Sequence, residues 1–141
     1  MALGKLTFEI FDHILTKISH RPLKLVTVGY PDCLVTEDFI VERFGKEIQS
    51  QIVFRDDSAD IIRWHNLGQY LDRIIETSSL LKLIGIDMSV LDISEVRGGE
   101  IICDLNEPVP ASLHGAFDIV LDAGAMEHCF NVGQVMNNFV T

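Results

Sequence analysis

The chain has 141 residues, and 48% of them are hydrophobic, so it is long and apolar enough to bury the core of one folded domain. This composition excludes an intrinsically disordered chain. The formal net charge is −10 and no cluster of Lys or Arg is present, so the sequence predicts no nucleic-acid partner.

The three cysteines, Cys33, Cys103 and Cys129, lie far apart and lack the short paired spacing of a zinc site or a disulfide framework. We interpret them as reduced thiols and predict no metal site. No segment approaches the ~20 apolar residues that cross a bilayer, and the N-terminus has no basic region followed by an apolar run. We therefore expect a soluble cytoplasmic protein with no membrane partner.

The first part of the chain predicts a helix, a strand and a second helix in that order. Residues 6–19 carry apolar side chains at helical spacing, and a proline soon follows. Residues 23–29, LKLVTVG, form a short β-branched run closed by glycine, which is typical of a buried strand and a tight turn. Residues 36–45 offer Thr36 as an N-cap, two acids in the first turn and a glycine stop.

The segment 46–80 gives mixed signals. Residues 51–55, QIVFR, suggest a strand, whereas residues 67–76, LGQYLDRIIE, have helical spacing. Residues 58–65, SADIIRWH, fit either structure. We interpret residues 46–80 as an insertion between the first and second strands of the domain.

The later sequence predicts three strands that each finish on an acid. A helix ends at Gly85, and MSVLDIS then forms a strand ending at Asp92, EIICDL one ending near Asp104 and FDIVLDA one ending near Asp122. Residues 131–140, NVGQVMNNFV, are typical of a helix that packs back on the sheet.

Residues at strand ends are the candidates for a binding site, because ligands of open parallel sheets bind outside the carboxyl ends of the strands. A carboxylate there can accept hydrogen bonds from both hydroxyls of a ribose, a second polar group can recognise the adenine edge, and glycine allows close backbone approach. The candidate binding residues are Gly29, Tyr30, Asp92, Asp104, Leu105, Asp122, Ala123 and Gly124.

Two segments resemble class I S-adenosylmethionine-dependent methyltransferases. Residues 101–110, IICDLNEPVP, are similar to the adenine-side loop of that family, and residues 117–131, FDIVLDAGAMEHCFN, to the segment after its fourth strand. The resemblance implies an α/β fold with a three-layer, Rossmann-like, mostly parallel open sheet, its visible strands in the order 3-2-1-4 and helices on both faces. It also implies S-adenosylmethionine as cofactor and an in-line attack by an unidentified methyl acceptor on the sulfonium methyl.

On this basis, residues 1–22 form a lead-in helix, and residues 23–141 form a methyltransferase-like domain whose C-terminal strands we expect to be missing. The strand at 117–123 would then lie at a sheet edge with few charges to protect it. Such an edge is a template for association. We therefore expect either a homodimer through this edge or a further strand from a longer protein.

The first loop departs from the family's pattern. It reads VGYPDC, which keeps Gly29 but places Tyr30, Pro31 and Cys33 where small residues are expected. The alternative hypothesis is therefore a non-catalytic nucleoside-binding or protein-interaction module on a degenerate methyltransferase fold. A dinucleotide-dependent dehydrogenase is set aside, because no GxGxxG run follows the first strand.

Some roles within the site stay open. Asp87 competes with Asp92 for the ribose hydroxyls, although we favour Asp92 because Asp87 would fall in the preceding turn. Glu127 and His128 are weak catalytic candidates, since methyl transfer to an activated sulfonium often needs no base. Acids at strand ends are also ordinary capping residues.

Overall fold

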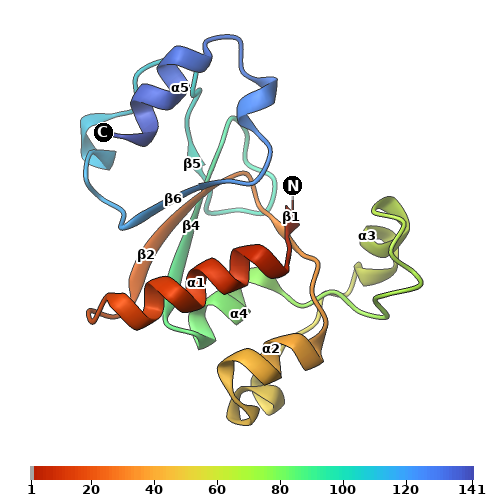
Figure 1. The fold of residues 1–141 in the computed structure, drawn as a ribbon. Coiled ribbons are helices and arrows are strands. Elements are labelled where there is room, and N and C mark those ends of the chain that lie inside the picture. Colours follow the sequence, from red (N-terminus) through yellow and green to blue (C-terminus); the bar gives the residue numbers. More distant parts are fainter. Residues whose placement is uncertain (1) are drawn as a thin grey trace. The chain divides into compact units, whose positions relative to one another are not determined.

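The computed structural model describes residues 2–141, which form two compact units (Figure 1). The sheet unit comprises Pro22–Tyr30 and Ile86–Thr141, and the helical unit comprises Ala2–Arg21 and Pro31–Gly85. Each unit is therefore assembled from segments that are separated along the chain.

The sheet unit contains a parallel sheet in the order β5-β4-β2-β6 among the described residues (Figure 1). Its strands are β2 (Leu23–Val28), β4 (Ile86–Asp92), β5 (Ile101–Ile102) and β6 (Ile119–Asp122). In chain order these are strands 1 to 4, so the predicted order 3-2-1-4 and the α/β class are confirmed. The arrangement is that of a Rossmann-like open sheet, with β6 at one edge.

Strand β2 is central and is buried on both faces. Leu25 and Thr27 point to one side and Val26 and Val28 to the other, and all four are buried. The start of the β2–β6 pair is fixed by the same aspartate twice: the Lys24 amide donates to Asp118 Oδ2, and the Asp118 amide donates to the Lys24 carbonyl, each at 2.8 Å. These two hydrogen bonds fix the register at the start of the β2–β6 pair.

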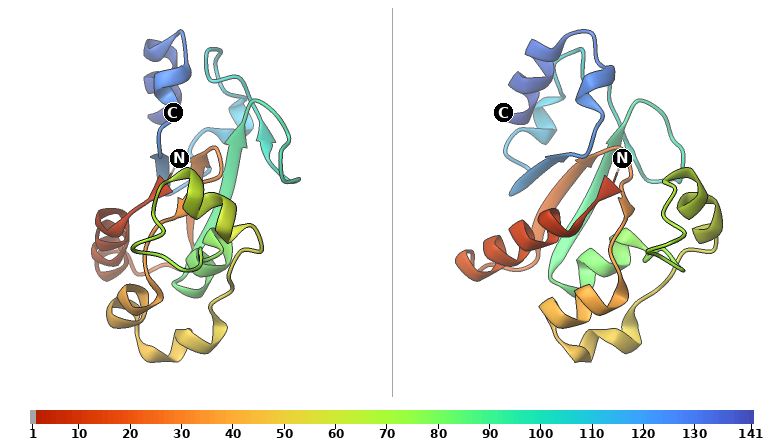
Figure 2. Two further views of the ribbon diagram at one scale, coloured as in Figure 1. Left: turned by 90° about the vertical axis from the view of Figure 1, so that its right-hand side faces the viewer. Right: turned by 45° about the vertical axis from the view of Figure 1, so that its right-hand side comes forward.

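One face of this sheet is covered by α5 (Val132–Phe139). Asn131 is the N-cap of this helix, and its side-chain oxygen accepts from the Gln134 amide. Val135 is completely buried against Val26 and Val28 of β2. Figure 2 shows α5, in dark blue, near the ends of the strands. The connections contain short 3-10 turns, η2 (Ala111–Leu113) and η3 (Met126–His128). The predicted C-terminal helix is thus confirmed.

The helical unit is built around aromatic and aliphatic side chains of its helices. Phe8 packs edge to face on Phe11 and Phe44. The elements of this unit are β1 (Ala2–Leu3), α1 (Lys5–Lys17), β3 (Asp32–Cys33), α2 (Glu37–Phe44), η1 (Lys46–Gln51), α3 (Ser58–Trp64) and α4 (Thr77–Leu83). None of the helices in residues 2–141 combines the length and apolar character needed to cross a membrane.

The helix predicted at residues 67–76 is wrong. The chain there makes one turn and then an extended bridge, in which the Arg55 amide donates to the Ile74 carbonyl and the Glu76 amide to the Val53 carbonyl. Leu71 and Ile74 are buried, as helical spacing suggested, but they reach the core from a turn. The strand predicted at residues 51–55 is correspondingly reduced to this bridge.

The docking of α5 gives the first prediction. Replacing Val135 with Ala should lower the free energy of unfolding by about 2 kcal/mol, because two buried methyl groups are lost at roughly 0.8 kcal/mol each and a small cavity remains. Val132→Ala on the same helix is the control, since Val132 is 45% exposed and should change stability by less than about 0.5 kcal/mol. Equal effects in urea denaturation would contradict the packing of α5 on the sheet.

Candidate functional site

A pocket of about 430 Å³ opens at the carboxyl ends of the parallel strands, entirely within the sheet unit. We call it the strand-end pocket. Five of the predicted binding residues line it, namely Gly29, Asp92, Asp104, Leu105 and Gly124. The weak catalytic candidate His128 also lines it, and the remaining lining residues are Leu91, Ile93, Cys103, Asn106, Ala125 and Cys129.

Two glycines shape the backbone of this pocket. Gly29 follows β2 with φ +70°, and its amide donates to the Leu91 carbonyl at 2.8 Å, which continues the pairing with β4 by one residue. Gly124 follows β6 with φ +114°. Both values lie where side chains with a Cβ are disfavoured, so the turns after these two strands depend on glycine.

Asp92 is the last residue of β4 and is half-buried at the pocket wall. Its carbonyl accepts from the Cys103 amide at 2.8 Å, and its Oδ1 accepts from the Ser94 amide at 3.3 Å. Its Oδ2 has no hydrogen-bond partner among residues 2–141. Asp87, by contrast, is an exposed residue near the start of β4, opposite Lys24, and does not line the pocket. The structure therefore places Asp92, not Asp87, at the strand end, although Asp87 lies within the strand and not in a turn.

Asp104 lies in the loop after β5, immediately after Cys103. Its Oδ1 accepts from both the amide and the side chain of Asn106, at 2.9 and 2.8 Å. The next residue, Leu105, is buried and lines the pocket. A carboxylate and an apolar side chain thus stand next to each other on this wall.

Three of the predicted binding residues, Tyr30, Asp122 and Ala123, do not line the strand-end pocket. The Asp122 carboxylate accepts from the amides of Gly124, Ala125 and Met126, at 2.6 to 3.0 Å. These bonds make Asp122 the residue that shapes the turn into η3. The Tyr30 ring lies 4.0 Å from the Arg97 guanidinium, at cation–π distance.

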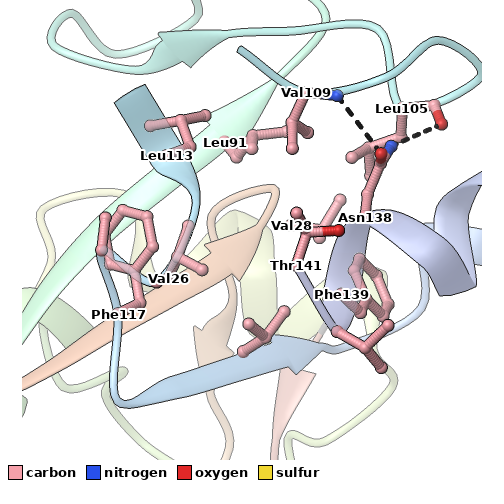
Figure 3. Close-up of a pocket in the computed structure, with 14 residues that line it drawn as sticks. Val26, Val28, Leu91, Leu105, Val109, Leu113, Phe117, Asn138, Phe139 and Thr141 are labelled. Carbon is pink, nitrogen blue, oxygen red and sulfur yellow. Dashed lines mark hydrogen bonds between the residues drawn. The ribbon is translucent and has the colours of Figure 1, made fainter. Parts of the chain in front are cut away.

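Two asparagines of the α5 segment hold the loop that carries Asp104 and Leu105, and the sequence did not single them out. At one end of the helix, the Asn131 amide donates to Asn106 Oδ1 at 2.9 Å. At the other end, the Asn138 side chain donates to the Leu105 carbonyl and accepts from the Val109 amide (Figure 3). It also donates to the Glu107 carbonyl. The sequence pointed to only one of these two residues, because Asn131 stands at the N-cap position of the C-terminal helix.

Glu127 and His128 lie in η3 with their side chains 72% and 78% exposed. Glu127 Oε1 is 3.8 Å from His128 Nε2, and only His128 lines the pocket. Solvent screens such an exposed pair strongly. The imidazole of His128 is therefore a hydrogen-bonding group at the edge of the pocket.

The environment of the cysteine near the carboxylates disfavours its thiolate form. Burial raises the pKa of the Cys103 thiol above its ordinary value, and the negative charge of Asp104 raises it further. Cys33, in the helical unit, is fully buried, and burial raises the pKa of its thiol to about 12. Cys33, Cys103 and Cys129 are all free of disulfides.

No family model, curated protein or solved structure matches this chain. Function is therefore inferred from the geometry and chemistry of the site itself.

The contacts of Asn138 give the second prediction. Asn138→Ala removes the four hydrogen bonds that this side chain makes within the described chain, three to the 105–109 loop and one with Gln134, and should lower the free energy of unfolding by about 1–3 kcal/mol. Asn137→Ala is the matched control, because the neighbouring Asn137 is exposed and its side chain makes none of these bonds. If both variants lose the same stability in urea, Asn138 does not anchor the loop.

The raised pKa of Cys103 gives the third prediction. Because the thiolate is the reactive form, Cys103 in the folded chain should react with iodoacetamide more slowly than in the chain unfolded by urea. Its rate should also level off at a higher pH in the folded chain than in the unfolded chain, because the pKa of the thiol is raised only in the folded chain. Peptide mass spectrometry measures each site separately, with buried Cys33 as the unreactive reference. A rate that levels off at or below the ordinary thiol pKa would contradict the desolvated environment.

Proposed function

We propose that the chain is the cofactor-binding part of a class I S-adenosylmethionine-dependent methyltransferase, with the cofactor held in the strand-end pocket. One observation carries the proposal. Gly29, Asp92, Asp104, Leu105 and Gly124 lie at or just after the carboxyl ends of four strands, and they line a single pocket of about 430 Å³. That volume lies within the ~300–1,000 Å³ typical of small-molecule sites.

Asp92 is the proposed acceptor for the ribose hydroxyls. Its Oδ2 is without a partner among residues 2–141, while its Oδ1 has only the long contact with the Ser94 amide. The carboxylate therefore retains acceptor capacity for two hydroxyl donors. Asp87 is exposed and lies outside the pocket, which supports Asp92 over Asp87 for this role.

Asp104 and Leu105 are the proposed adenine-side residues. The Oδ1 atom of Asp104 accepts from Asn106, but its Oδ2 is without a partner among the described residues. This Oδ2 can accept a hydrogen bond from the amino group of adenine. The buried Leu105 offers an apolar surface for a ring. The hydrogen bonds from Asn138 and Asn131 hold this loop in place, so the site is pre-formed.

The charge of the pocket favours a cationic nucleoside over a nucleotide. Asp92 and Asp104 are its acidic lining residues, and neither Lys nor Arg lines it. A phosphate group would meet like charge there, in a chain whose net charge is −10. S-adenosylmethionine carries a net positive charge and fits this environment.

When bound, S-adenosylmethionine supplies a methyl group already activated by its sulfonium. The chain's own residues are therefore needed for positioning, which accounts for much of the rate in such reactions. His128 is proposed to orient the acceptor or line the cofactor at the pocket mouth, with Glu127 beside it. The methyl acceptor is not specified by these residues.

A second candidate function is a non-catalytic nucleoside-binding or interaction module. It is favoured by the first loop, where Tyr30 replaces a small residue and its ring contacts Arg97. A large side chain held there would limit close approach of the methionine moiety to the backbone. Such a module would bind the nucleoside without supporting transfer.

Isothermal titration of the 141-residue chain tests the proposal. Micromolar binding of both S-adenosylmethionine and S-adenosylhomocysteine, with much weaker binding of adenosine monophosphate, is the expected result. Binding of adenosine with no preference for the methionine-bearing compounds would support the non-catalytic nucleoside module. Absence of binding by all of these compounds would overturn both readings of the pocket as a nucleoside site.

The ribose assignment is the fourth prediction. Asp92→Asn should weaken S-adenosylhomocysteine binding by about 1–3 kcal/mol, since a charged acceptor for two hydroxyls is lost. Asp87→Asn removes the same charge from the same strand outside the pocket and should leave the affinity unchanged. If Asp87→Asn weakens binding and Asp92→Asn does not, the ribose lies elsewhere. Circular dichroism of both variants confirms that the fold is retained.

A further inference from the structure

The sheet unit is acidic, and Lys24 and Arg97 are its only Lys and Arg residues. Lys24 is the second residue of β2 and lies near the amino ends of the strands, opposite Asp87. Arg97 lies in the exposed loop that leaves the carboxyl end of β4 and leads to β5. Arg97 is therefore the one Lys or Arg of this unit that follows the strand ends where the strand-end pocket opens.

Arg97 differs from most arginines of the helical unit in its partner. Its guanidinium carbon lies 4.0 Å from the centre of the Tyr30 ring, and no carboxylate within residues 2–141 forms an ion pair with it. In the helical unit, four arginines each pair with an acid, namely Arg43, Arg55, Arg63 and Arg73. The N–H donors of Arg97 therefore make no hydrogen bond to the described part of the chain. A guanidinium presents such donors in a planar fork that matches a carboxylate.

The backbone that carries Arg97 is fixed by a carboxylate of its own loop. Glu100 Oε1 accepts from the Arg97 amide at 2.7 Å and from the Val96 amide at 3.3 Å. Gly98 and Gly99 complete the turn with φ +87° and +89°, a conformation that favours glycine. Glu100 thus bonds to the backbone of Arg97 and not to its guanidinium. A fixed backbone lowers the entropic cost of binding a ligand group through this side chain.

The contact between Tyr30 and Arg97 lies beside the strand-end pocket. Gly29, which directly precedes Tyr30, lines that pocket. Ile93, the first residue after β4, lines it as well. Because β2 and β4 pair in parallel, their following loops leave the same edge of the sheet, and the Tyr30–Arg97 contact joins these loops there. The guanidinium therefore lies at the rim of the pocket, outside its lining.

The position at the rim decides which anionic group Arg97 can accept. A 5′-phosphate is attached directly to the ribose, so it would lie close to Asp92 and meet like charge. The amino-acid end of S-adenosylmethionine or S-adenosylhomocysteine lies several bonds farther from the ribose, where its carboxylate can extend to the rim. The Tyr30 side chain would limit the approach of this end to the backbone of the first loop. A side chain is then the available source of hydrogen-bond donors.

We propose that Arg97, stacked on the Tyr30 ring, is the residue that selects for a carboxylate on the ligand of the strand-end pocket. This inference rests on the proposed function and names a specificity-determining residue for it. A nucleoside with an amino-acid end gains an ion pair at the rim, and a nucleoside without one does not. The large ring of Tyr30, which departs from the pattern of the first loop, is the surface that holds the guanidinium.

Isothermal titration of the 141-residue chain with S-adenosylhomocysteine and 5′-methylthioadenosine tests the proposal. Both compounds carry adenosine and a thioether, but only the first has the amino-acid end. Arg97→Gln should weaken S-adenosylhomocysteine binding at least about tenfold, which corresponds to ~1.4 kcal/mol, and leave the affinity for 5′-methylthioadenosine unchanged. Lys24→Gln is the matched control, because it removes the same charge from the other end of the strands and should change neither affinity.

The two ligands separate recognition from support of the fold. An equal loss of affinity for both compounds in Arg97→Gln would mean that Arg97 only holds the loop, which would overturn the proposal. No loss for either compound, or an equal loss in Lys24→Gln, would overturn it too. Each of these outcomes leaves the proposed function intact if the unsubstituted chain binds S-adenosylhomocysteine. Absence of binding of both compounds to the unsubstituted chain would overturn the proposed function together with this inference.

Added salt gives a second readout that a purely structural role would not change. Raising the NaCl concentration from about 50 mM to about 500 mM should reduce the preference of the unsubstituted chain for S-adenosylhomocysteine over 5′-methylthioadenosine, because salt screens an exposed ion pair. In Arg97→Gln the ratio of the two affinities should stay constant. A preference of the unsubstituted chain that does not respond to salt would contradict an ion pair at the rim.

A pair of Tyr30 variants tests the surface that holds Arg97. Tyr30→Phe keeps the ring face and should bind S-adenosylhomocysteine as the unsubstituted chain does. Tyr30→Leu removes the face and should weaken this binding about two- to fivefold, the range expected of an exposed cation–π contact. An equal loss in both variants, or no loss in either, would show that the ring does not position the guanidinium and would overturn that part of the proposal.

Discussion

The parallel register of β2 between β4 and β6 is the constraint on which the rest of the sheet unit depends. Val28 lies opposite Leu91 on one side and Asp122 on the other, so the three strands finish at the same edge. Gly29 and Asp92 are thereby brought to one pocket, although they are far apart in sequence. A slip of one residue would turn Val26 and Val28 to the opposite face and separate them from Val135 of α5. The mutual hydrogen bonds of Lys24 and Asp118 oppose such a slip on the β6 side.

Elements with strong local signals were predicted from the sequence. The run LKLVTV has the β-branched, unbroken apolar character of a strand buried on both faces, and Thr36 caps α2 through the Phe39 amide at 3.2 Å. The helix predicted at 67–76 failed because burial of Leu71 and Ile74 satisfies the same spacing from a turn, while the backbone near Ile74 bonds to Arg55. The parallel pair β1–β3 was not predicted, since strands of two residues have no periodicity and depend on a distant partner.

The sequence predicted the part of the candidate site that the strand ends form. Asp92 and Asp104 follow from the rule that ligands gather at the carboxyl ends of parallel strands, and both line the pocket. Asp122 obeys the same rule, but the three amides that follow it use both of its carboxylate oxygens. Asn138 was beyond sequence reasoning, because its role arises only when α5 lies against the 105–109 loop. Sequence thus predicted some of the residues that border the pocket, and long-range hydrogen bonds decide how they are held.

We propose that the strand-end pocket receives the adenosyl group of S-adenosylmethionine. A crystal structure of the chain with S-adenosylhomocysteine tests it most directly. The expected density places the ribose hydroxyls on the Asp92 carboxylate and the adenine beside Asp104 and Leu105, with the 105–109 loop unchanged because Asn138 already holds it. Density for the ligand at any other place on the chain, or with the ribose turned away from Asp92, would contradict the claim.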